Sequence, residues 1–168
     1  MASSAKPRFT RQPAPPLQQL LLKAPRLVYR GPIAEALRQR CVMLLTTVGR
    51  KSGKGRTTGV SFMPLGDRLI VFSGWGASSN WYRNVLANPE VEVQVGRRKV
   101  KATARLVSDP EQRRQLMLQM QRRSSQCGPP RPVRTILKAL RLFDYEGEIS
   151  LAVAQGGDLP VIEIVPHG

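Results

Sequence analysis

Short apolar runs separated by turn residues fill the middle of the chain. Five such runs are rich in Val, Ile, Leu and Thr, and Gly, Pro or Asp stands between them. This pattern is typical of consecutive β-strands joined by short turns. A sixth run of the same kind stands near the C-terminus. The predicted strands are residues 42–47, 56–63, 68–73, 91–95, 99–106 and 160–165.

The fourth and fifth runs show the clearest alternation. Val91, Val93 and Val95 share one face of the fourth strand, and small apolar residues alternate in the same way along the fifth, because side chains of a strand point to its two faces in turn. Only Gly-Arg-Arg at residues 96–98 links the two runs, which predicts a hairpin. The sheet is therefore predicted to be mainly antiparallel, and the lack of parallel βαβ crossovers argues against a Rossmann domain.

Helical periodicity stands on both sides of the predicted sheet. Residues 17–29, with a kink at Pro25, and residues 33–40 predict two basic amphipathic helices. After the sheet, Asp109 is a predicted N-cap of a helix that ends near Gln121. A Pro/Gly/Ser-rich break precedes one more helix, whose apolar stripe lies between basic residues. The stripe is Val133, Ile136, Leu137 and Leu140, and the flanking residues are Arg131, Arg134, Lys138 and Arg141.

Length and charge set the class of protein. The 168 residues suit one domain rather than two independent cores. The 27 Lys and Arg against 11 Asp and Glu give a formal net charge of +16, which implies a polyanion, an anionic surface or a phosphorylated ligand as partner. No run approaches the roughly 18 consecutive apolar residues of a membrane span. We expect a flexible, basic, Pro-rich arm over residues 1–16 and a single domain over residues 17–168.

The inventory of reactive residues excludes several enzyme classes. His167 is the only histidine and stands next to the C-terminus, which argues against Ser-His-Asp and Cys-His mechanisms. Cys41 and Cys127 are far apart and have no metal-ligand spacing, so the sequence suggests neither a zinc site nor a disulfide framework. The N-terminal residues lack the apolar core of a signal peptide. We expect a reduced, cytoplasmic protein.

The densest group of cations lies between the first two predicted strands. Residues 49–56 read Gly-Arg-Lys-Ser-Gly-Lys-Gly-Arg. Glycines let a backbone approach an anion closely, and Arg and Lys supply charge-assisted hydrogen bonds. The spacing is not that of a Walker A loop, since Gly49 and Gly53 enclose three residues and Lys54 precedes a glycine. Both a phosphate-binding loop and a solvated basic hairpin fit this segment.

A second group follows the third predicted strand. Residues 73–84 combine Ser and Gly with Trp75 and Trp81, the two tryptophans of the chain. Small residues at a strand end let a planar ring lie against backbone, and a tryptophan can form a wall beside it. The alternative is that Trp81 and Tyr82 fill the core beneath a loop.

Taken in order, these two segments resemble the deazaflavin-dependent nitroreductase family. The resemblance is carried by Leu-Leu-Thr-Thr-Val-Gly-Arg-Lys-Ser-Gly at residues 44–53, by Arg56, and by Trp-Tyr-Arg-Asn-Val-Leu-Ala-Asn-Pro at residues 81–89. It continues through residues 91–95 to the C-terminal run 159–162. The family implies an α+β fold, a mainly antiparallel split β-barrel of the FMN-binding type with an N-terminal helix and flanking helices.

The resemblance implies an oxidoreductase that carries coenzyme F-420, a deazaflavin with a phospholactyl-oligoglutamate tail. The cationic loop would hold the tail, and the small residues would line the ring. Hydride transfer needs position and electrostatics more than a nucleophile, so we expect no strictly catalytic side chain and no metal. The implied cofactor-binding residues are Arg50, Lys51, Ser52, Gly53, Lys54 and Arg56 in the loop and Ser73, Gly74, Ala77, Trp81 and Asn84 in the second segment.

Departures from the family leave the acceptor open between unsaturated, quinone-like and nitro compounds. Members that reduce nitroimidazoles usually carry a proline before the Trp-Tyr pair and an aromatic cluster near the C-terminus. Here Asn80 precedes Trp81, and Tyr145 is the only tyrosine after Tyr82. FMN, or another flavin or tetrapyrrole ligand, is the alternative to the deazaflavin, and a homodimer stays open because two protomers often complete one site in this fold.

The positive charge outside the cationic loop suggests partners other than a small molecule. The basic segment 122–142 and the N-terminal helix suit an anionic bilayer, which would place the protein at the inner face of the cell membrane. A helix that packs its apolar stripe on the barrel is the alternative. Nucleic-acid binding without catalysis has little support, because aromatic residues are only 5% of the chain and no recognition signature is present.

Overall fold

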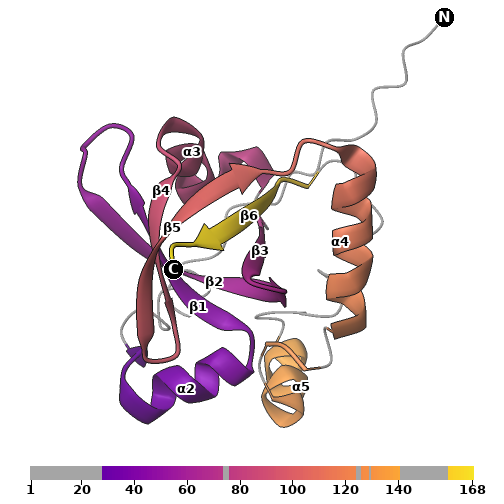
Figure 1. The fold of residues 1–168 in the computed structure, drawn as a ribbon. Helices are drawn as coiled ribbons and strands as arrows, with labels where there is room; N and C mark the ends of the chain where they lie inside the picture. Colours follow the sequence, from indigo (N-terminus) through magenta and orange to yellow (C-terminus); the bar gives the residue numbers. More distant parts are fainter. Residues whose placement is uncertain (1–27, 74–75, 124–125, 129, 141–158) are drawn as a thin grey trace, which may run out of the picture.

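Six antiparallel strands close into a barrel in the computed structural model of the chain (Figure 1). The structure describes residues 28–73, 76–123, 126–128, 130–140 and 159–168. The order around the barrel is β1-β2-β3-β6-β5-β4, with β4 returning to pair with β1. The strands are β1 (Val42–Val48), β2 (Gly55–Leu65), β3 (Arg68–Phe72), β4 (Glu90–Val95), β5 (Arg98–Leu106) and β6 (Val161–Pro166). The predicted antiparallel sheet is confirmed.

The core fills the barrel because apolar residues alternate along each strand. Met43 and Leu45 of β1, Val93 of β4 and Ile162 and Ile164 of β6 are all fully buried there. The alternation of β4 and β5 follows the predicted hairpin, with a two-residue turn at Gly96 and Arg97 and Val95 opposite Arg98. Inward and outward positions thus match the pleat expected of a strand with one face in the core.

Three helices cover the barrel ends and one side. α2 (Gly31–Gln39) lies beneath the start of β1, and α3 (Asn80–Ala87) lies at the other end, near the turn between β1 and β2 (Figure 1). α4 (Pro110–Arg123) packs on the barrel through Leu116 and Met120. The predicted N-cap of α4 is confirmed, since Asp109 Oδ2 accepts a hydrogen bond of 3.1 Å from Gln112 N.

Three residues of the predicted apolar stripe at the last described helix, α5 (Arg131–Ala139), are exposed, and the side chain of the fourth, Leu137, lies outside what the structure describes. Val133, Ile136 and Leu140 are 42%, 58% and 62% exposed. The predicted arm, most of the predicted N-terminal helix and Arg141 lie outside the described residues. None of the helices within the described ranges is long and apolar enough to cross a membrane.

Cys41 and Cys127 form a disulfide, so the expectation of two unpaired thiols was wrong. Their Cα atoms are 5.1 Å apart although 86 positions separate them in the chain. The two cysteines meet because the segment after α4 packs against the connection between α2 and β1. There Gly128 N donates a hydrogen bond of 2.9 Å to Arg40 O. Spacing in the sequence carries no information about a contact of this range.

Candidate functional site

A tight turn carries the cationic loop between β1 and β2. Gly49 N donates to Lys54 O at 2.8 Å, and Gly53 N donates back to Gly49 O at 2.7 Å. Gly53 has φ +65°, a conformation that favours glycine. A Cβ atom on Gly49 would stand 2.7 Å from Ser52 Oγ, which is too close. These contacts fix the backbone of the turn, and its basic side chains are exposed.

The cations of this turn have no acidic partner. Arg50, Lys51, Lys54 and Arg56 are exposed, and none of them pairs with a carboxylate anywhere in the described ranges. Four positive side chains on one short turn repel each other and attract an anion with several negative groups. The arrangement therefore fits a ligand with phosphate or carboxylate groups.

Asn84 joins this loop to α3. Its side chain is 4% exposed, and its Nδ2 donates to Thr47 Oγ1 at 3.0 Å. Its Oδ1 accepts from the backbone N of Arg50 at 3.2 Å and from Arg50 Nη1 at 3.1 Å. One buried amide thus fixes the end of β1, the start of the turn and the guanidinium of Arg50 together.

A second asparagine completes the support of Arg50. Asn80 lies one helical turn before Asn84 on α3, so both side chains stand on the same face. Asn80 Oδ1 accepts from both Nη1 and Nη2 of Arg50 at 3.3 Å. The helix holds the guanidinium in a defined orientation at the surface rather than leaving it to sample solvent.

The segment before α3 is organised by a pair of serines. Ser73 is fully buried, and its Oγ donates to Ser79 Oγ at 2.8 Å. Ser73 N donates to Pro160 O at 3.0 Å, which ties the end of β3 to the start of β6. Ala77 is exposed, and its carbonyl accepts from Arg83 Nε at 2.9 Å. Gly74 and Trp75 lie outside the described residues.

The two aromatic residues of α3 have different roles. Tyr82 is buried in the barrel core, as the core interpretation of this segment predicts. Trp81 is half-buried and packs partly against the same core, with its ring at 86° to that of Tyr82 and 6.3 Å between centroids. Only Trp81 keeps part of its ring available to a ligand.

The two predicted segments therefore meet at one end of the barrel, through the contacts of Arg50 and Asn84. Asn84 was expected to line a ring, but its polar atoms are used inside the protein. Sequence reasoning missed Thr47, Asn80 and Ser79. The spacing of Asn80 and Asn84, four residues apart on a predicted helix, was a signal that could have found one of them.

Comparison with known proteins matches this part of the chain. A family model described as F420H(2)-dependent quinone reductase covers residues 26–128, which contain both the cationic turn and α3. The F420H(2)-dependent quinone reductase of Mycobacterium tuberculosis is 36% identical over 74 residues, 41% of this chain and 50% of the relative. The chain thus spans about half the length of the relatives that it matches in this way.

Solved structures share the fold. HutZ, the heme storage protein from Vibrio cholerae, superposes with a TM-score of 0.53 at 20% identity and covers 82% of this chain and 89% of its own. A conserved hypothetical protein from Mycobacterium tuberculosis gives 0.53 at 14% identity, over 81% and 79% of the two chains. At such identities the likeness shows the barrel fold alone, which is the fold expected from the sequence.

Proposed function

We propose, from the premise that this chain belongs to the F420H(2)-dependent quinone reductase family, that it transfers a hydride from reduced coenzyme F-420 to a quinone-like acceptor. The observation that carries the proposal is the turn of unpaired cations joined by Asn84 to α3. A deazaflavin with a phosphate and several carboxylates is the ligand whose charge pattern this end of the barrel matches.

The loop residues would hold the anionic tail of the coenzyme. Arg50 offers a planar fork suited to a phosphate, and Lys51, Lys54 and Arg56 offer charge to carboxylates farther along the tail. The hydroxyl of Ser52 would add a neutral donor, and Gly53, which has open space where a Cβ would stand, would let the ligand approach the backbone closely. Because Asn80 and Asn84 already orient Arg50, little side-chain entropy is lost when the anion binds.

The residues around α3 would hold the ring. Ser73, Gly74 and Ala77 are small, so a planar ring could lie near their backbone, and the exposed part of Trp81 would stand beside it. Asn84 acts through Arg50 and is a positioning residue rather than a direct ligand. When bound, the coenzyme supplies the hydride. The chain's own contribution is to bind, orient and shield the reacting partners, which accounts for a site without a nucleophile or a histidine.

Titration of the purified protein with coenzyme F-420, followed by tryptophan fluorescence, tests the proposal. We expect saturable binding that Arg50→Ala weakens by about tenfold or more, as for loss of a charge-assisted hydrogen bond. The exposed Arg98→Ala on β5 is the matched control and should bind as the parent does. Saturable binding of FMN in place of coenzyme F-420, or no binding of either, would contradict the assignment.

Turnover then identifies the acceptor. Reduced coenzyme is mixed with the protein and either menadione or a nitroimidazole, and the return of deazaflavin absorbance is recorded. We expect the quinone to be reduced faster than the nitro compound. A preference for the nitro compound would show that the acceptor, but not the coenzyme, has been misassigned.

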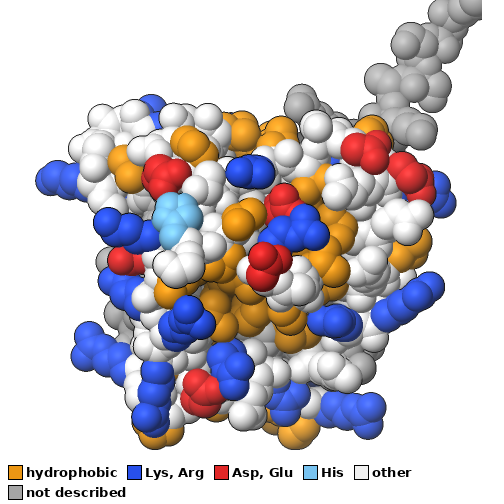
Figure 2. Space-filling model, viewed as in Figure 1, with side chains coloured by type: hydrophobic (Ala, Val, Ile, Leu, Met, Phe, Trp, Pro, Cys, Tyr) orange, Lys and Arg blue, Asp and Glu red, His pale blue; other side chains and the backbone are white. Residues whose placement is uncertain are grey.

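We also propose that α5 rests on the anionic inner face of the cell membrane. Its stripe of Val133, Ile136 and Leu140 is exposed, and basic residues such as Arg131 flank it. Basic side chains also line the lower edge of the molecule, where α2 and α5 lie (Figure 2). Each cation near an anionic surface contributes about 1 kcal/mol. This placement would bring the protein close to lipid-soluble quinones.

Flotation with vesicles separates this proposal from a purely electrostatic contact. Vesicles of phosphatidylcholine with phosphatidylglycerol should carry the protein, and the Ile136→Gln, Leu140→Gln double variant should float less. Leu118→Gln is the control, because Leu118 is an exposed leucine on α4. Equal flotation of all three proteins would leave no role for the α5 stripe.

A further inference from the structure

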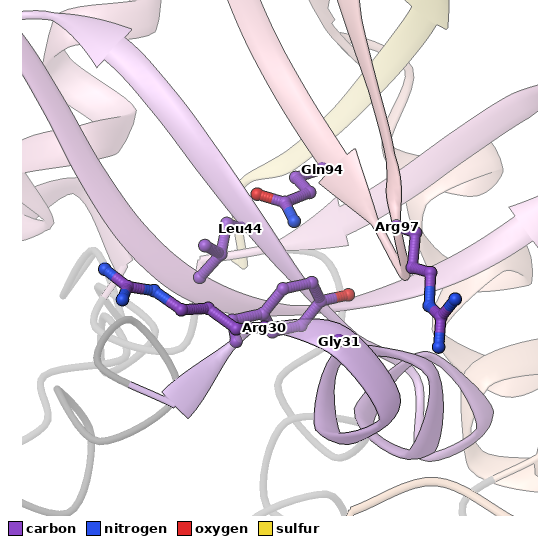
Figure 3. Close-up of a pocket in the computed structure, with 6 residues that line it drawn as sticks. Arg30, Gly31, Leu44, Gln94 and Arg97 are labelled. Atoms are coloured by element: carbon purple, nitrogen blue, oxygen red, sulfur yellow. The ribbon is translucent and has the colours of Figure 1, made fainter.

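A pocket of about 630 Å³ lies at the end of the barrel opposite to the cationic turn. β1 runs from this end, where Leu44 lines the pocket, to the turn that begins at Gly49. Five residue steps of extended strand, about 16 Å, separate Leu44 from Gly49. The lining residues are Tyr29, Arg30, Gly31, Leu44, Gln94 and Arg97 (Figure 3).

Hydrogen bonds fix the floor and one wall of this pocket. Tyr29 is 2% exposed, and its hydroxyl donates to Val42 O at 2.8 Å and accepts from Gly96 N at 2.9 Å. Gln94 Nε2 donates to Gly96 O at 3.2 Å. The chain before α2, the start of β1 and the β4–β5 turn are thereby locked together, so the cavity does not depend on the position of one surface side chain.

The two arginines of the pocket are available. Arg30 and Arg97 are exposed, and neither guanidinium has a hydrogen bond or ion pair to any residue that the structure describes. Two neighbouring cations at this end are paired with acids instead. Arg38 pairs with Glu35, whose carboxylate lies against Gly96, and Lys99 Nζ stands 2.8 Å from Glu92 Oε1.

The lining combines positive charge with an apolar floor. The guanidinium groups of Arg30 and Arg97 stand on opposite sides of the pocket, and Leu44 and Gln94 lie between them (Figure 3). No carboxylate is among the lining residues. An inorganic anion would contact only the arginines, whereas a molecule with an apolar body and an anionic head would contact the arginines and the apolar lining as well.

We propose that this pocket binds a small organic anion, with its apolar body over Tyr29 and Leu44 and its charged head at Arg30 or at Arg97, on either side. The site is separate from the proposed coenzyme site and does not rest on the proposed function. The same chemistry is offered by an aromatic acid and by the head of an anionic lipid, and the test below distinguishes these two sources.

The probe is 8-anilinonaphthalene-1-sulfonate, which has an aromatic body and one sulfonate. Its fluorescence is titrated with the protein and with the Arg30→Gln, Arg97→Gln double variant. We expect the double variant to raise the dissociation constant by about tenfold or more, because neither arginine is left to form a charge-assisted contact with the sulfonate. The control is Arg98→Gln, Lys101→Gln, which removes two exposed cations outside the lining and should bind as the parent does. N-phenyl-1-naphthylamine, which lacks the sulfonate, should bind all three proteins equally.

Amide chemical shifts locate the bound probe. The titration should move the backbone amides of Gly31 and Gly96 and the side-chain amide of Gln94. Monomeric dihexanoylphosphatidylglycerol is titrated in parallel: shifts with the sulfonate alone indicate an aromatic acid, and shifts with the lipid, alone or as well, indicate a headgroup. The proposal would be overturned by shifts confined to α5 or to Gly49 and Gly53. It would also be overturned if both double variants weakened binding equally, or if neither probe bound saturably.

Discussion

Both ends of the barrel carry cations, but the cations are arranged differently. At the turn end, Arg50 is held by Asn80 and Asn84, and the other cations of the turn pair with no acid that the structure describes. At the α2 end, Arg38 and Lys99 pair with acids, and Arg30 and Arg97 flank a pocket. A net charge of +16 describes neither arrangement.

The difference shows that the partners and surroundings of a cation decide whether it can bind a ligand. A cation that is paired with an acid has little charge left to attract a ligand. An oriented cation without an acidic partner can bind an anion, and a free cation beside an apolar cavity favours anions that also have an apolar part. The same two ends also differ in what holds them. A buried amide organises the turn end, whereas a tyrosine hydroxyl and a disulfide organise the α2 end.

Removal of the disulfide should have the largest effect on stability and none on the turn end. The Cys41→Ala, Cys127→Ala double variant opens a loop closed over a separation of 86 residues, for which chain entropy predicts a loss of about 4.6 kcal/mol in the free energy of unfolding. Urea denaturation measures the loss, and reductant should affect the parent but not the variant. A change in coenzyme affinity larger than the change in stability would show that the two ends are coupled.

Asn84→Ala should damage the turn end in two ways. It removes the donor to Thr47 Oγ1, which keeps only its bond of 3.5 Å to Arg56 O, and the acceptor of the part-buried backbone N of Arg50, and we expect the two losses to cost about 2 kcal/mol together. Coenzyme affinity should fall as well because Arg50 loses its support. Asn80→Ala, at an exposed position of the same helix, should lower stability far less. If both variants unfold at the same urea concentration as the parent, Asn84 does not organise this end.

Tyr29→Phe should weaken the α2 end alone. Val42 O and Gly96 N lose their shared hydroxyl partner, and we expect a loss of about 2 kcal/mol in unfolding free energy with coenzyme affinity unchanged. Thermal denaturation and coenzyme titration of the same samples measure both quantities. An equal loss of coenzyme affinity would contradict the independence of the two ends.

The same tyrosine gives a test by pH. Burial raises the pKa of Tyr29 above its ordinary value of 10.0, Glu35 adds to the rise, and the Gly96 hydrogen bond and Arg38 oppose it. Because the pKa of Tyr29 is higher in the folded than in the unfolded protein, its contribution to the free energy of unfolding is complete at pH values below the pKa of the unfolded state. That contribution is lost as the pH rises through the pKa of the folded state. The parent should therefore lose stability above pH 10.0, and this part of the loss should be missing in Tyr29→Phe.

Arg50→Lys should have the smallest effect of the series and the most specific one. The charge is kept, but the planar fork that contacts both asparagines is lost, so coenzyme affinity should fall by about tenfold while stability changes little. Arg97→Lys at the other end is the matched control and should leave coenzyme affinity unchanged. Equal affinity of Arg50→Lys and the parent would reduce the role of Arg50 to charge alone.

Much of the fold follows from local pattern, because each strand has one face in the core. The predicted first strand, residues 42–47, is found at Val42–Val48, and the Asp109 cap opens α4 as expected. Contacts between distant segments leave no such pattern. The Cys41–Cys127 disulfide depends on where the stretch after α4 returns to the barrel, and the exposed stripe of α5 shows that amphipathicity predicts a helix but not what covers its face.

The sequence could predict which residues form the candidate site but not how they are arranged in space. The cations of residues 50–56 and the small residues before α3 were visible as two separate segments. Their meeting depends on Asn84, whose buried position arises from the packing of α3 over the end of β1. An asparagine on a short helix looks the same in sequence whether it faces a ligand or a neighbouring strand.

Titration of isotope-labelled protein with oxidised coenzyme F-420, followed through the backbone amides of the glycines, tests directly whether the coenzyme binds at the cationic turn. We expect saturable shifts at Gly49, Gly53 and Gly55 in the turn and unchanged positions for Gly31 and Gly96 at the α2 end. Shifts at Gly31 and Gly96 with an undisturbed turn, or no shifts at either end, would contradict binding at the turn.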